Sequence, residues 1–119
     1  MADTPPKVLQ SCATRLRGHA SFFANLSPYV EADELEMKRA AIESIMDEAL
    51  NHLDASKKGS FKSAISEAEI GIRALLRSIH REKDTSREFF KEGKEVSSFL
   101  KTAASLLSVM SPVMFMFHS

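Results

Sequence analysis

The side chains that most often carry out chemistry in proteins, histidine and cysteine, are few in this chain and widely spaced. There are four histidines and one cysteine, Cys12. A di-iron centre in a helical bundle uses Glu-x-x-His motifs, but none of the four histidines has a glutamate three positions before it. One cysteine with scattered histidines also lacks the ligand spacing of a zinc site. The sequence therefore predicts no metal ion and no cofactor.

The sequence also lacks the motifs of a nucleotide-binding site and of a catalytic nucleophile. The four glycines, Gly18, Gly59, Gly71 and Gly93, are too far apart for a phosphate-binding loop or a dinucleotide fingerprint. Cys12 falls on the apolar side of its predicted helix, so we interpret it as a buried small residue rather than a nucleophile. Because no group of nucleophile, base and oxyanion donors is visible, we expect a protein that is not an enzyme.

Two polar features have both a structural and a functional interpretation. His52 follows the apolar stripe of its predicted helix, and a partly buried side chain bonded to a neighbour is favoured over a ligand or switch. Arg73, Arg77 and Arg81 form a row at four-residue spacing that could receive a phosphate or an acidic partner. A solvated face directed at an acidic helix is favoured for this row.

Charge and cysteine usage limit the partners and the compartment. The chain has 16 basic and 16 acidic residues, so its formal net charge is zero and no global field attracts nucleic acid. A single cysteine cannot form an intramolecular disulfide, which fits a reducing compartment. The N-terminus has no basic region followed by an apolar one, as a secretory signal would. We expect a cytoplasmic protein, with a peripheral membrane location as the alternative.

The first half of the chain has the apolar spacing of two helices. One is predicted over residues 5–26, where Pro28 ends the pattern. The second is predicted over residues 31–57, since it begins with an acidic run suited to a helix N-terminus. Gly59 follows two lysines and is predicted to end this helix.

The second half predicts two more helices with the clearest periodicity of the chain. Ser60 is expected to cap a helix over residues 60–83, and Thr85 is expected to begin a helix over residues 85–110. The apolar positions of the third helix recur at intervals of four and three, and they are Phe61, Ile65, Ala68, Ile72, Leu75 and Ile79. Gly71 within this helix indicates close approach of a neighbour. Ile70 lies off the stripe, and we favour a widened core face over an exposed contact point.

Four helices joined by short loops predict one all-α domain over residues 1–119, an antiparallel up-down-up-down four-helix bundle. The second helix is acidic and its two neighbours are basic, which favours this order of helices. A helix-turn-helix DNA reader around Gly59 is disfavoured, since its helix is acidic and the chain has no net charge.

The segment after the fourth helix is unusual because it is apolar without keeping a helical rhythm. Pro112 breaks the pattern in residues 111–119, yet five large apolar side chains follow it: Val113, Met114, Phe115, Met116 and Phe117. Burying each of them is worth about 1.5–3 kcal/mol, so something should cover them. The candidates are the open end of the bundle, a partner groove, self-association, a membrane interface, or a longer protein of which this chain is one part.

Bundle topology places three lysines, Lys57, Lys58 and Lys62, near this apolar segment. The sequence therefore favours a non-enzymatic helical interaction or assembly module, such as the N-terminal domain of a longer signalling protein. The alternative is a bundle that associates with anionic membranes through these lysines and the apolar segment. In architecture alone, a four-helix bundle followed by an apolar segment is similar to the N-terminal executioner domains of membrane-permeabilising cell-death proteins, which implies membrane association.

Overall fold

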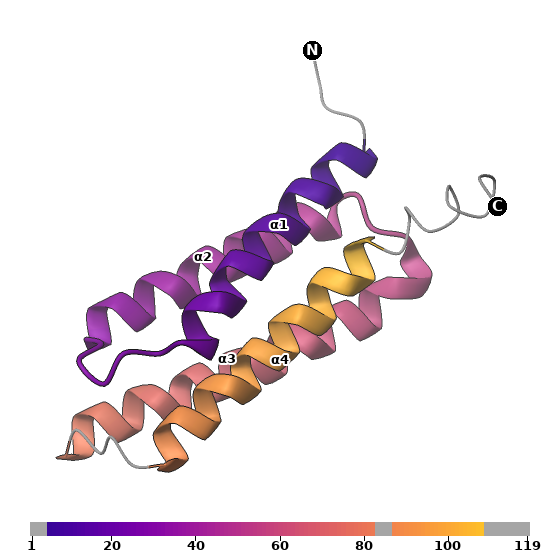
Figure 1. Ribbon diagram of the computed structural model, residues 1–119. Coiled ribbons are helices and arrows are strands. Elements are labelled where there is room, and N and C mark those ends of the chain that lie inside the picture. Colours follow the sequence, from indigo (N-terminus) through magenta and orange to yellow (C-terminus); the bar gives the residue numbers. More distant parts are fainter. Residues whose placement is uncertain (1–4, 83–86, 109–119) are drawn as a thin grey trace, which may run out of the picture.

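The computed structural model describes residues 5–82 and 87–108, and the regular structure within these residues consists of four helices, with no strands. The helices are α1 (Pro5–Ala24), α2 (Ala32–Leu50), α3 (Ala55–Glu82) and α4 (Arg87–Ser108) (Figure 1). The predicted all-α fold class is confirmed.

Each helix packs against two others, and the packing is consistent with a four-helix bundle. The contacts run from α1 to α2, α2 to α3, α3 to α4 and α4 back to α1, while the remaining two pairs barely touch. The α1 and α4 helices lie side by side along most of their lengths (Figure 1). The central side chains of the core are fully buried and come from all four helices: Leu16, Phe23, Leu35, Ile42, Phe61, Ile72, Leu75, Val96 and Leu100.

The boundary between α2 and α3 differs from the prediction. The α2 helix ends at Leu50, the chain turns over residues 51–54, and α3 begins at Ala55. Asp54 stabilises the start of α3, because its carbonyl accepts a hydrogen bond from the Lys57 N–H at 2.9 Å and its carboxylate accepts one from Ser56 at 3.0 Å. The predicted helix end at Gly59 and the predicted cap at Ser60 are therefore wrong.

Gly59 lies exposed inside α3 instead. A glycine in a helix interior costs only about 1 kcal/mol relative to alanine, so it does not stop a helix that buries a long apolar face. Asn51 and Asp54, whose short polar side chains favour turns and caps, mark the true break. The predicted start of the fourth helix at Thr85 lies outside the described residues.

Two other glycines allow helices to approach closely. A Cβ added to Gly93 of α4 would lie 2.8 Å from the Phe23 carbonyl oxygen of α1, so a larger residue here would force the two helices to shift. A Cβ added to Gly71 of α3 would collide with the Val96 side chain of α4. The close approach predicted at Gly71 is confirmed, and Gly93 plays the same part between α4 and α1.

Candidate functional site

The lysines predicted to contact a partner lie in the first turns of α3. Lys58 and Lys62 are exposed and Lys57 is half-buried. The apolar residues predicted to act with them, Val113, Met114, Phe115, Met116 and Phe117, lie outside the described residues. The described part of the predicted site is thus a basic surface at the N-terminal end of α3.

The single cysteine lies in the core. Cys12 is fully buried in α1, and burial raises the pKa of its thiol. Arg15 donates to the Cys12 sulfur at 3.4 Å, and the same guanidinium nitrogen lies 2.9 Å from Glu48 of α2. The interpretation of Cys12 as a buried small residue is confirmed.

The histidines do not gather into a site. His19 is half-buried in α1, and burial lowers the pKa of its imidazole, with the nearby positive charge of Lys38 adding to the effect. His52 is exposed in the turn after α2, so its interpretation as a partly buried residue of a helix is wrong. The side chains of His80 and His118 lie outside those described. Within the described residues, no three His, Cys, Asp or Glu side chains are arranged to hold a metal ion.

The arginine row of α3 lies beside carboxylates. Arg73 and Arg77 are both exposed, and the side chain of Arg81 is outside those described. The charge of Arg73 opposes the raised pKa of Glu69 on the same helix, and the charge of Arg77 opposes that of Glu92 on α4. These positions favour the solvated interpretation of the row over a phosphate site.

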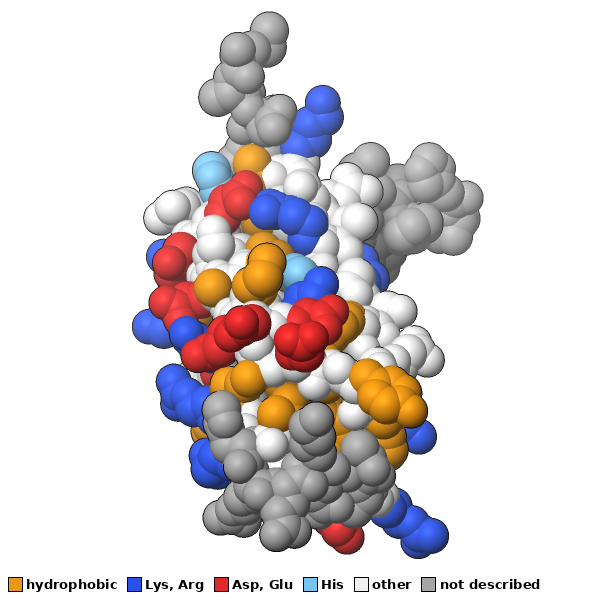
Figure 2. Space-filling model, turned by 90° about the vertical axis from the view of Figure 1, so that its left-hand side faces the viewer, with side chains coloured by type: hydrophobic (Ala, Val, Ile, Leu, Met, Phe, Trp, Pro, Cys, Tyr) orange, Lys and Arg blue, Asp and Glu red, His pale blue; other side chains and the backbone are white. Residues whose placement is uncertain are grey.

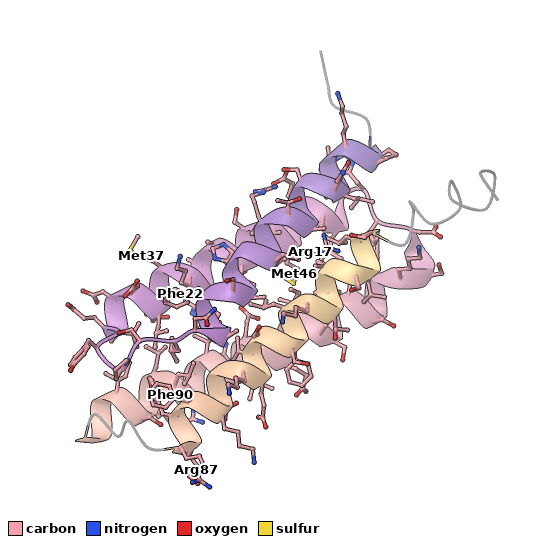
Figure 3. All side chains as sticks on the ribbon, in the orientation of Figure 1. Arg17, Phe22, Met37, Met46, Arg87 and Phe90 are labelled. Carbon is pink, nitrogen blue, oxygen red and sulfur yellow. The ribbon has the colours of Figure 1, made fainter. Side chains whose placement is uncertain are left out.

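Three large apolar side chains are exposed outside the core. Tyr29 is 88% exposed in the connection between α1 and α2, Met37 is 72% exposed on α2, and Ile70 is 53% exposed on α3. Met37 points away from the bundle, whereas Met46 of the same helix points inward (Figure 3). The favoured interpretation of Ile70 as part of a wider core face is wrong.

Acidic and hydrophobic side chains share one face of the molecule (Figure 2). Figure 2 shows Asp and Glu side chains grouped in the middle of this face, with hydrophobic side chains exposed around them. The sequence placed an acidic run at the start of the second helix, and Asp33 and Glu34 occupy the first turn of α2. Tyr29 and Met37 were not predicted, although Met37 falls off the apolar stripe of its helix and could have been found by that signal.

A groove lies between α3 and α4, with a volume of about 430 Å³. Its lining combines three carboxylates with apolar and small residues: Glu67, Ile70, Gly71, Glu92, Glu95, Ser98 and Phe99. Burial raises the pKa of Glu92, and the neighbouring charge of Glu95 raises it further. The groove was not predicted, because its walls come from two helices and only their packing brings them together.

None of the helices in the described ranges is long and apolar enough to cross a membrane. A comparison with protein-family models, curated proteins and solved structures gives no match for this chain.

Proposed function

We propose that this protein is a non-enzymatic helical interaction module, built as an up-down-up-down bundle, that assembles through its C-terminal apolar segment. The observation that carries the proposal is the surface at one end of the helices. Exposed Lys58 and Lys62 mark the start of α3, and α4 ends on the same side of the molecule (Figure 1). The last described residues of α4 therefore lie on the side of the molecule that carries these lysines.

The order and direction of the helices support this topology. Short connections over residues 25–31 and 51–54 join helices that contact each other, as antiparallel neighbours do. In Figure 1, α1 begins and α2 ends on the side where α3 begins and α4 ends. In this arrangement exposed Lys7, Lys58 and Lys62 belong to helix ends on that side, and exposed Lys101 lies about two turns before the end of α4.

Sedimentation of the full chain and of residues 1–110 tests the assembly function. We expect the full chain to self-associate reversibly and the shortened chain to be monomeric with unchanged helical circular dichroism, because five apolar side chains are removed. An equally monomeric full chain in the absence of any partner would leave self-association without support, and an unfolded shortened chain would show that the segment belongs to the core.

Association with anionic membranes is the second candidate, and the same basic surface favours it. Each lysine near an anionic membrane contributes about 1 kcal/mol, so the lysines need the apolar segment for firm binding. The test is co-sedimentation with phosphatidylserine-containing vesicles at low salt. Replacing Lys57, Lys58 and Lys62 with glutamate should abolish binding, whereas the same change at Lys91 and Lys94, exposed near the start of α4, should not. Binding that survives the first change contradicts the membrane function.

A further inference from the structure

The groove between α3 and α4 is lined in part by apolar side chains that water reaches. Ile70 is 53% exposed, and Phe99 is a partly buried side chain that packs against the core from α4. Gly71 allows this depth, because a Cβ there would lie 3.2 Å from Glu92 Oε2 and would collide with Val96. An aromatic ring and a branched aliphatic side chain therefore lie beside a carboxylate in one depression.

The charges along the groove are unbalanced. Glu67 of α3 and Glu92 and Glu95 of α4 all line it, and Glu92 and Glu95 are three residues apart on one helix, where like charges repel. Of the side chains that the structure describes, ion pairs form at Arg15–Glu48 and around Arg39, and none includes a groove carboxylate. Arg77 and Lys91 reduce the repulsion at Glu92 only from a distance. A cation in the groove would relieve this repulsion.

We propose that this groove binds an arginine side chain presented by a basic segment of a protein partner. Arginine fits the lining better than other cations, because its planar guanidinium stacks on an aromatic face and donates paired hydrogen bonds to a carboxylate. Phe99 supplies the ring, Glu92 and Glu95 supply the acceptors, and Ile70 covers the aliphatic part of the side chain. A volume of about 430 Å³ is large enough for one or two long side chains.

This binding surface is separate from the lysines and apolar segment of the proposed assembly function. It lies along the middle of α3 and α4, and its charge has the opposite sign. The two surfaces can therefore be disrupted independently, and failure of one does not remove the other.

The proposal is tested by titrating the ¹⁵N-labelled protein with a blocked helical peptide of about 14 residues that contains alanine, leucine and three arginines. We expect shifts of the backbone amides of Ile70, Gly71 and Phe99, and an affinity that falls as salt rises. The same peptide with lysine in place of arginine should bind at least about threefold more weakly, because lysine cannot form the paired bonds.

Variants locate the binding. The double variant Glu92→Gln with Glu95→Gln should lower the affinity for the arginine peptide about tenfold or more. Ile70→Ser should lower this affinity by a smaller factor. Glu34→Gln with Asp47→Asn, on exposed positions of α2, is the matched control and should leave the affinity unchanged. Circular dichroism checks that each variant keeps its helices.

Three outcomes overturn the proposal. The first is no shift at the groove at low salt, and the second is equal loss of affinity in the control variant. The third is binding of free arginine amide as tightly as the peptide, which would make the groove a site for a small cation rather than for a protein segment.

Discussion

The α1–α4 interface and the attachment of α2 are built differently. The α1–α4 contact is the most extensive among the described helices, and at Gly93 the backbone of α4 comes close to the Phe23 carbonyl of α1. The α2 helix makes fewer contacts with both of its neighbours. Two of its links to α1 are peripheral: Lys38 lies 4.7 Å from the centre of the Phe22 ring, and Glu48 pairs with Arg15 at the surface.

This difference indicates where stability resides. Close contact between backbones leaves no room for relaxation, so α1 and α4 should open only with global unfolding. A helix held by a few large side chains and exposed charge pairs opens at lower free energy, since such pairs contribute about 1 kcal/mol or less. We therefore expect α2 to open at lower free energy than α1 or α4.

The largest effect on the free energy of unfolding should come from shortening a buried side chain in α4 and one in α2. Leu100 of α4 and Ile42 of α2 are both fully buried. Leu100→Ala should lower the free energy of unfolding by about 3–5 kcal/mol, and Ile42→Ala by about 2–3 kcal/mol, because the looser α2 site can collapse around the cavity. Chemical denaturation measures both values. Equal costs, or a larger cost at Ile42, would show that α2 is as tightly packed as α4.

A second prediction concerns the glycines. Gly93→Ala adds a Cβ 2.8 Å from the Phe23 carbonyl oxygen, and this overlap should destabilise the fold by about 1–3 kcal/mol. Gly18→Ala is the matched control, since nothing lies within 4 Å of its Cβ. It should stabilise the fold by about 0.5–1 kcal/mol through the helix preference of alanine. Thermal unfolding separates the two, and stabilisation by both substitutions would argue against close α1–α4 packing.

The sequence predicted the features that depend on periodicity within one helix. The third helix shows this best: Phe61, Ile65, Ala68, Ile72 and Leu75 were all predicted for one apolar face, and all are buried. Apolar spacing predicts burial reliably, because residues at this spacing lie on one side of a helix and that side packs against the core. Gly71 was identified as a point of close approach by another local signal, the cost of about 1 kcal/mol that a glycine carries in a helix interior.

The sequence could not predict which side chains stay exposed where two helices meet. Ile70 was expected in a wider core, but α3 and α4 meet beside it and leave it in an open groove with Phe99. The α2–α3 turn was missed for another reason: Gly59 was a familiar stop signal, whereas burial of Leu53 and the bonds to Asp54 determine where α3 begins. Several local sequence signals can each mark a helix end, and tertiary contacts determine which of them is used.

The smallest effect on stability is expected at the interface between α2 and α3, where Glu69 of α3 lies near Glu43 of α2. Burial raises the pKa of Glu69, the charge of Glu43 raises it further, and Arg73 and Arg39 oppose the shift. Its Oε2 atom is buried without a hydrogen-bond partner in the described part of the chain. The folded state thus holds the Glu69 proton more tightly than the unfolded chain does.

Stability should therefore fall as pH rises from the ordinary carboxyl pKa to the raised pKa of Glu69, because the unfolded chain binds fewer protons over that interval. Glu69→Gln should raise the Tm at pH 7, and this gain should shrink toward zero as pH falls below the ordinary carboxyl pKa. Asp47→Asn, on an exposed position of α2, is the control and should change neither the Tm nor its pH dependence. Calorimetry from pH 4 to pH 7 measures the difference. If the gain at Glu69 persists unchanged at low pH, its cause lies in packing, and the loose attachment of α2 is not set by this carboxylate pair.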